Sequence, residues 1–148
     1  MLTKLRQGLA DHQPRINSHL QKRASVLIPL LECEGELFVM LTQRSEKLNS
    51  HAGQVSFPGG KQDAQDANSL ETALRETHEE IGLLPEKVEI IGTLDQILSL
   101  HYYLVTPFVG LIPDDFIPVP NEEEIEAVFK APLSFFMKSD QHWTEEFK

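Results

Sequence analysis

The chain has 148 residues, of which 41% are hydrophobic and 24% charged, and this is typical of one soluble domain with one hydrophobic core. Its formal net charge of −10 argues against nucleic acid or an anionic membrane surface as the main partner, because both attract clustered Lys and Arg. The lone Cys33 excludes an internal disulfide and a cysteine-rich zinc site, and it favours a cytoplasmic location.

The N-terminal part of the chain indicates a helix followed by a β-hairpin. It lacks the apolar run of a signal peptide, and no stretch reaches about 18 consecutive apolar residues, so we expect neither export nor a membrane span. Residues 3–10 can form a short helix. Residues 24–31 indicate a strand that Pro29 places at an edge or a bulge. After a short turn, residues 36–44 indicate the returning strand.

A long polar loop follows this hairpin and ends in a short strand before a pair of glycines. Long loops in compact domains are more often functional than idle. Arg44 can hold a phosphate through two hydrogen bonds, while Ser45, His51 and Gln54 offer neutral donors and acceptors. A purely structural role, with Arg44 closing the strand end and His51 packing the loop, explains these residues equally well.

An amphipathic helix is predicted after the glycine pair. Asn68 suits its N-cap, with Glu71 as the capping-box partner, and Gly82 followed by Pro85 indicates its end. Residues spaced at about 100° form one stripe that should face the core. This stripe consists of Leu70, Ala73, Leu74, Thr77 and Ile81.

Glu76, Glu79 and Glu80 fall together on a different face of this helix. Like charges at such spacings repel by a few tenths of a kcal/mol per pair, and only Arg75 lies near enough in sequence to offset them. Crowded carboxylates suit a hard divalent cation, and Mg²⁺ prefers a few carboxylates together with water and substrate phosphate. A solvated acidic face is the alternative, which the preceding glycines disfavour, so we expect a phosphate compound as ligand.

Beyond the helix, further strands are expected at residues 88–94, 103–112 and 125–130, the second interrupted by Pro107. A proline-rich surface loop at 113–120 precedes the last strand, and residues 133–137 can form a helical turn after it.

The loop at residues 95–102 carries Ser99, His101 and Tyr102. These side chains can contact a bound ligand, although aromatic residues beside strands more often belong to the core.

The two glycines Gly59 and Gly60, together with the run Arg-Glu-Thr-His-Glu-Glu-Ile-Gly-Leu at residues 75–83, resemble the Nudix box of the pyrophosphate-hydrolase superfamily. The general box has Glu where this chain has Asp66, and seven residues rather than eight before the Arg-Glu pair. In the superfamily that Glu mainly braces the loop against the helix. The resemblance therefore implies an adjusted loop, an intact metal face, and an α/β (α+β) fold with a mixed β-sheet between helices.

Residues 41–60 resemble the signature that precedes the box in the coenzyme A pyrophosphatase branch of the superfamily. Members of this branch tend to carry Asp at the position of Asp66 and the same longer spacing, whereas Asn49 stands where a basic residue is common. The resemblance implies a set of substrate-binding residues: Arg44, Ser45, His51, Gln54 and Phe57.

The resemblance also implies catalytic roles. Mg²⁺ or Mn²⁺ would be held by the Gly60 carbonyl, Glu76, Glu79 and Glu80. Arg75 would orient the glutamates, and a glutamate would deprotonate the attacking water. Glu79 is the first choice for this base. In the family a loop glutamate before the last strand often joins the metal cluster or acts as base, and Glu124 is the best-placed match, ahead of Glu122 and Glu123.

Members of the branch usually continue with another strand and a long closing helix, whereas this chain ends at Lys148. We therefore treat residues 1–148 as a single Nudix hydrolase domain with a helical lead-in at 1–23 and a short C-terminus. Apolar surface left uncovered by a missing helix tends to find a partner, so a homodimer is one expected assembly.

The function that the resemblance implies is hydrolysis of coenzyme A or acyl-CoA to 3′,5′-ADP and 4′-phosphopantetheine or its acyl form. The same chemistry on ADP-ribose, a dinucleotide or a nucleoside triphosphate is the alternative, which Asn49 and the short C-terminus motivate. A nucleotide-binding module without turnover is a third hypothesis, and the presence of Arg75 together with Glu76, Glu79 and Glu80 argues against it.

Overall fold

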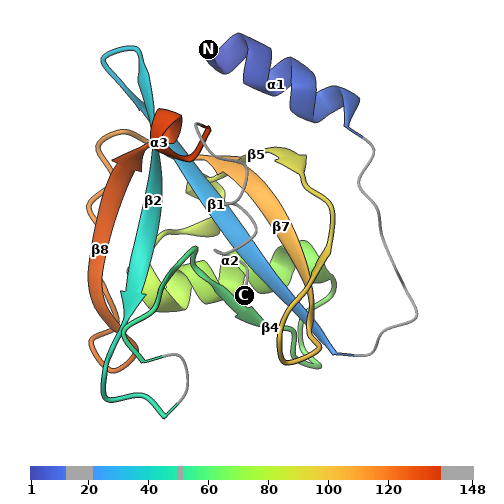
Figure 1. Ribbon diagram of the computed structural model, residues 1–148, viewed down its shortest axis with the longest axis vertical. Coiled ribbons are helices and arrows are strands. Elements are labelled where there is room, and N and C mark those ends of the chain that lie inside the picture. Colours follow the sequence, from blue (N-terminus) through green and yellow to red (C-terminus); the bar gives the residue numbers. More distant parts are fainter. Residues whose placement is uncertain (13–21, 50–51, 138–148) are drawn as a thin grey trace.

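A mixed sheet of eight strands forms the centre of the molecule, with helices on both of its faces (Figure 1). The computed structural model describes residues 1–12, 22–49 and 52–137. The fold is therefore the α/β (α+β) arrangement of a mixed sheet between helices that the sequence implies. Among the described residues, no helix combines the length and the apolar character needed to cross a membrane.

Each helix and strand predicted from the sequence is present, with ends that agree within two residues. The sequence predicts neither β4, which contains the glycine pair, nor the turn η1, nor β6, which lies in the expected loop 95–102. In chain order the elements are α1 (Leu2–Asp11), β1 (Arg23–Cys33), β2 (Glu36–Arg44), β3 (Val55–Ser56), β4 (Gly59–Lys61), α2 (Ser69–Ile81), the 3-10 turn η1 (Pro85–Lys87), β5 (Glu89–Thr93), β6 (Ile97–Leu98), β7 (Leu104–Leu111), β8 (Ile125–Pro132) and α3 (Leu133–Met137).

Strand β1 is the central strand of the sheet, which has the order β3-β2-β1-β7-β5. It runs parallel to β7 and antiparallel to β2, and its N-terminal part also pairs with the short strand β4. Strand β8 pairs with β2, and β6 pairs with β7. The pairing of β4 with β1 fixes the glycine pair against the middle of the sheet.

Two predictions about prolines are wrong. Pro29 lies in the central strand rather than at an edge, opposite Gly110 of β7. On its other side, the pairing of β1 with β4 ends at Val26 and the pairing of β1 with β2 begins at Leu30. Pro29 lies in the gap between these two pairings, where a residue without a backbone N–H is tolerated. Pro107 does not interrupt β7, which continues through it in parallel pairing with β1.

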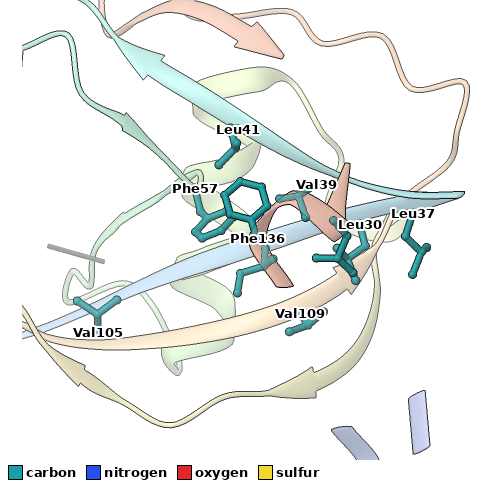
Figure 2. Close-up of a cluster of buried hydrophobic side chains, with 10 residues drawn as sticks. Leu30, Leu37, Val39, Leu41, Phe57, Val105, Val109 and Phe136 are labelled. Atoms are coloured by element: carbon teal, nitrogen blue, oxygen red, sulfur yellow. The ribbon is translucent and has the colours of Figure 1, made fainter. Parts of the chain in front are cut away.

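Two hydrophobic clusters lie on opposite faces of the sheet. Because alternate residues of a strand point to opposite sides, Leu27 and Ile28 of β1 belong to different clusters. Helix α2 covers the cluster of Leu27, whereas α3 covers the cluster of Ile28 through Leu133 and Phe136. Figure 2 shows the second cluster, with Phe136 against the side chains of β2.

Residues 138–148 lie outside the described residues, and the predicted absence of a closing strand and helix falls on them. Residues 13–21 of the predicted lead-in also lie outside the described residues. The helical part of the lead-in is α1, whose Leu2, Leu5 and Leu9 pack against the sheet.

Substitution of Leu27 should destabilise the fold, because its side chain is fully buried (0% exposed) beneath α2. We expect Leu27→Ala to lower the free energy of unfolding by about 3 kcal/mol through lost burial and a residual cavity. Urea denaturation measures this. Leu98→Ala, at a side chain that is 53% exposed, is the control and should change stability by no more than about 0.5 kcal/mol. Equal effects of the two substitutions would contradict the assigned core.

Candidate active site

Helix α2 begins and ends where the sequence predicts. The side chain of Asn68 accepts a hydrogen bond from the backbone N–H of Glu71 at 2.8 Å, and the Glu71 carboxylate accepts one from the backbone N–H of Ala67 at 3.2 Å. Gly82 has the left-handed φ of 77° and donates its N–H to the His78 carbonyl. Both ends of the helix are thus fixed locally, which sets the register of its glutamates.

The buried face of α2 contains the predicted Ala73, Thr77 and Ile81, whereas Leu70 and Leu74 are only half-buried. The polar Thr77 is accommodated because its hydroxyl donates to the Ala73 carbonyl at 2.7 Å. This face packs on β1 and β7, and the acidic side of the helix, of which Glu80 is also buried, lies beside β4.

Asp66 and Arg75 form a buried ion pair between the loop after β4 and helix α2. The Asp66 side chain is 1% exposed, and its two oxygens accept hydrogen bonds from Nε and Nη2 of Arg75 at 2.8 and 2.9 Å. It also accepts from the Thr72 hydroxyl at 2.8 Å and from the backbone N–H of Asp63 at 3.0 Å. The Arg75 guanidinium holds the pKa of Asp66 well below its usual range.

The guanidinium of Arg75 also contacts two glutamates of the acidic face. Its Nη1 donates to Glu76 at 2.8 Å and to both carboxylate oxygens of Glu79 at 3.3 Å. Its Nη2 reaches the Lys61 carbonyl at 3.3 Å, which connects the helix to β4. One side chain therefore joins the loop, the strand and two of the predicted metal ligands.

Glu76 lies against the backbone of β4, and only glycine leaves room for it there. A Cβ atom added at Gly60 would lie 2.4 Å from Oε2 of Glu76. A Cβ at Gly59 would lie 2.2 Å from the Ser25 carbonyl, so the neighbouring glycine is required by the sheet itself. Burial raises the pKa of Glu76, and the hydrogen bond from Arg75 opposes this shift.

Glu80 is the buried member of the acidic face. Its Oε1 accepts a hydrogen bond from the backbone N–H of Gly59 at 3.1 Å. Burial raises the pKa of Glu80 to about 8, with further contributions from the charges of Glu76 and Glu124, while the Gly59 hydrogen bond and Arg44 oppose the shift. A carboxylate in this position needs a nearby cation to stay ionised at neutral pH.

Glu124 approaches the helical glutamates from the loop before β8, and its charge acts on both Glu76 and Glu80. Its carbonyl accepts a hydrogen bond from the Ser45 backbone N–H at 2.9 Å, and the Asn121 N–H donates to the Glu80 carbonyl at 2.8 Å. These bonds tie the loop both to the end of β2 and to the end of α2. The competing Glu122 and Glu123 are exposed.

The predicted substrate residues fall into different environments. Arg44 is half-buried near Glu80, and its buried Nε has no hydrogen-bond partner among the residues that the structure describes. Ser45 is buried, and its hydroxyl accepts from the backbone N–H of Lys47 at 3.2 Å. Gln54 is exposed, and its backbone carbonyl accepts a hydrogen bond from the backbone N–H of Arg44 at 2.8 Å. His51 lies outside the described residues.

Phe57 requires a correction. The resemblance implies that it binds substrate, but it is 3% exposed and belongs to the hydrophobic cluster with Leu41 and Phe136 (Figure 2). Its ring is therefore used for packing, and we exclude it from the candidate site. A phenylalanine next to Pro58 in a short strand has no sequence signal that separates these two roles.

The acidic residues fit a divalent cation by donor type. In the described part of the chain, no group of three or more His, Cys, Asp or Glu side chains is arranged to hold a metal ion. Arg75 instead holds Glu76 and Glu79. The donors are nevertheless all oxygens, Glu80 is buried among like charges, and the space beside Gly60 admits a carboxylate, so the residues present fit a hard ion such as Mg²⁺.

The sequence model of the NUDIX domain family matches residues 21–146, and the chain belongs to this family. Nudix hydrolase 15, mitochondrial, of Arabidopsis thaliana is 48% identical over 128 residues, which cover 84% of this chain and 45% of that protein. The uncharacterized Nudix hydrolase NudL of Yersinia enterocolitica is 47% identical over 125 residues, covering 84% and 64%. The peroxisomal coenzyme A diphosphatase NUDT7 of Mus musculus is 42% identical over 130 residues, covering 87% and 55%. The chain thus spans 45% to 64% of the length of these relatives.

Solved structures share the fold at low sequence identity. A Caenorhabditis elegans Ap4A hydrolase binary complex has a TM-score of 0.67 and 17% identity, covering 86% of this chain and 93% of that one. The NUDIX domain of Shewanella oneidensis NrtR, complexed with ADP ribose, has a TM-score of 0.59 and 18% identity, covering 95% and 94%. At these identities the likeness concerns the fold alone.

The ion pair of Asp66 and Arg75 should control acid stability. We expect Asp66→Asn to lower the free energy of unfolding at pH 7 by about 3 kcal/mol, because it leaves a partly buried guanidinium uncompensated. The folded-state pKa of Asp66 is depressed, so its contribution is present above the unfolded pKa of about 4 and is lost as the pH falls below it. The stability of the variant should therefore fall less steeply between about pH 5 and pH 2.

Urea denaturation at several pH values measures both effects. Asp63→Asn is the matched control, because Asp63 is exposed and lies 3.7 Å from Arg75. It should change stability by no more than about 0.5 kcal/mol. An Asp66→Asn variant with the acid profile of the unsubstituted protein would refute the assignment.

Proposed function

We propose that this protein is a divalent-metal-dependent hydrolase of nucleoside-diphosphate-linked compounds, with coenzyme A or acyl-CoA as its substrate. The products would be 3′,5′-ADP and 4′-phosphopantetheine or its acyl form. The observation that carries the proposal is the buried Glu80 beside Glu76 and Glu124 at the glycine backbone of β4. Such a concentration of carboxylates would hold a metal ion, and the ion would in turn bind the substrate phosphates. The name of the mouse relative, a coenzyme A diphosphatase, supports the choice of substrate.

Proteins of this family generally depend on a divalent metal ion. We assign Mg²⁺ or Mn²⁺ to the Gly60 carbonyl, Glu76, Glu79 and Glu80. When bound, the ion would neutralise the diphosphate and lower the pKa of water. The bonds of 3.3 Å between Arg75 and Glu79 are long, so this carboxylate can exchange partners at little cost.

The protein's own residues would orient the substrate and accept a proton. Arg75 keeps Glu76 in place through its 2.8 Å hydrogen bond, and the ion pair with Asp66 keeps Arg75 in place. We assign a substrate phosphate to the half-buried guanidinium of Arg44, which lies near Glu80. Glu79, exposed on the helix, would take the proton of the attacking water, with Glu124 as the alternative base.

Two alternatives remain within the same fold. The substrate can instead be ADP-ribose, a dinucleotide or a nucleoside triphosphate, which the exposed Asn49 favours, because the coenzyme A branch often has a basic residue there. A nucleotide-binding module without turnover is the other. The homodimer and the cytoplasmic location stay predictions.

A comparison of substrates tests the proposed function. We expect coenzyme A to be hydrolysed in the presence of Mg²⁺ with a kcat/KM at least about 10-fold above that of ADP-ribose or NADH. A competing substrate that lacks a group which the site binds loses at least such a factor in kcat/KM. Mass spectrometry should detect 3′,5′-ADP and 4′-phosphopantetheine, and EDTA should abolish the reaction. Turnover of ADP-ribose or NADH without turnover of coenzyme A would overturn the substrate assignment. Nucleotide binding without any metal-dependent turnover would favour the non-catalytic module.

The assignment of the base can be tested by substitution. We expect Glu79→Gln to lower kcat by about 10²- to 10⁴-fold, because an amide cannot accept the proton of water. Glu86→Gln, at an exposed glutamate of η1 just beyond the helix, is the control and should retain kcat. If Glu79→Gln keeps full activity while Glu124→Gln loses it, Glu124 is the base. Full activity in both variants would contradict the proposed mechanism.

A further inference from the structure

A pocket of about 600 Å³ lies beside the candidate site and has no role in the mechanism above. The backbone of Gly60 forms part of its wall, together with the start of β1 and the turn between β6 and β7. Its floor is apolar, with Ala24 and Val105, and its rim carries Lys22 and Lys61. None of the described residues that line it is acidic, although the chain has 23 Asp and Glu against 13 Lys and Arg.

Both lysines lie over the same aromatic ring. The Nζ atoms of Lys22 and Lys61 are 5.8 and 5.2 Å from the centre of the Tyr103 ring. Each ammonium group is attracted by the ring face, but the two groups repel each other. An anion bound between them removes this repulsion and accepts hydrogen bonds from both, and a phosphate has oxygens enough for the two lysines at once.

The turn next to these lysines holds an aromatic side chain in an exposed position. Tyr102 has a backbone φ of 65°, which residues other than glycine rarely adopt, and its side chain is 73% exposed. Its N–H donates to the Ser99 carbonyl at 3.0 Å, and the next N–H, of Tyr103, donates to the Ser99 hydroxyl at 3.0 Å. The turn thus imposes a strained backbone that presents a ring to solvent at the rim of the pocket, and such strain is typical of binding sites.

Strand β4 separates this pocket from the glutamates of α2. A Cβ atom on Gly60 would point at Glu76, whereas the side chain of the next residue, Lys61, lies over Tyr103. Neighbouring residues of a strand point to opposite faces, so the acidic cluster and the lysine pair lie on the two sides of one short strand. Gly60 adjoins Glu76 on one side and lines the pocket on the other, so the positively charged pocket borders the acidic cluster.

We propose that this pocket binds the phosphorylated nucleoside half of the substrate, with a phosphate monoester between Lys22 and Lys61 and the planar base against Tyr102. The choice of substrate class rests on the proposed function, since coenzyme A carries such a phosphate on its ribose. The contacts themselves involve no residue of the proposed metal cluster other than the backbone of Gly60.

Binding of two nucleotides that differ by one phosphate tests the pocket without any turnover. We expect isothermal titration calorimetry to give a dissociation constant for 3′,5′-ADP at least about 10-fold lower than for 5′-AMP, because the additional phosphate makes two charge-assisted contacts. In a Lys22→Gln/Lys61→Gln double variant this difference should disappear. Lys87→Ala, at an exposed lysine of η1, is the control and should keep it. Equal affinities in the unsubstituted protein, or an unchanged difference in the double variant, would overturn the proposal.

A second variant separates loss of the ring from loss of the fold. Tyr102→Gly suits the left-handed backbone, so stability to urea should be kept or raised, while the affinity for both nucleotides falls by about 5-fold or more through lost stacking. Unchanged affinity for both would refute the contact with the base. If no coenzyme A is hydrolysed but the lysine-dependent preference for 3′,5′-ADP remains, the pocket stands and the proposed function fails. Coenzyme A can instead be hydrolysed while the ratio of the KM values for coenzyme A and 3′-dephospho-coenzyme A is the same in the double variant as in the unsubstituted protein. In that case the proposed function stands and only the pocket assignment fails.

Discussion

The buried ion pair of Asp66 and Arg75 is the constraint on which the candidate site depends. It joins the loop after β4 to the middle of α2, and from there Arg75 reaches Glu76, Glu79 and the carbonyl of β4. The box that the chain resembles has the longer Glu in place of Asp66 and a loop one residue shorter. A shorter side chain on a longer loop can reach the same guanidinium, and the four hydrogen bonds that Asp66 accepts fit this compensation.

Negative charge is concentrated where the fold is least able to solvate it. Glu80 is buried, Glu76 is half-buried, and Glu124 adds its charge from another loop. Arg75, Arg44 and the N–H of Gly59 offset part of this cost, yet the pKa of Glu80 still rises to about 8. An arrangement that is unfavourable for stability is usually kept because function requires it. This reasoning, rather than the acidity of the helix alone, makes the cluster a candidate for metal binding.

The sequence predicts what depends on near neighbours and misses what depends on strand pairing. Asn68, Glu71 and Gly82 act within one helical turn, so the ends of α2 can be predicted. The place of Pro29 in the central strand and of Phe57 in the core depends on which strands pair with β1 and β2, and no local signal carries that information. The sequence likewise does not predict Thr72 as a partner of Asp66. A threonine beside Ala73 on the buried face of a helix is nevertheless a usable signal, because its buried hydroxyl needs a hydrogen-bond partner. The lysines over Tyr103 come from separate segments, and only the fold brings them together.

The short strand β4 explains why the two candidate sites lie so close together. Gly60 is needed on the side of α2, where a Cβ would collide with Glu76, and this lets a carboxylate approach the backbone. Gly59 is needed because a Cβ there would collide with β1. On the other side the strand carries Lys61, in a pocket without acidic residues in the described part of the chain. In a chain of net charge −10, a phosphate compound is repelled almost everywhere. Affinity must then come from one local arrangement in which a cation on the acidic side and lysines on the other side each neutralise part of the substrate's negative charge. A substrate must place phosphates at both sides at once, which is a stricter requirement than either side imposes alone.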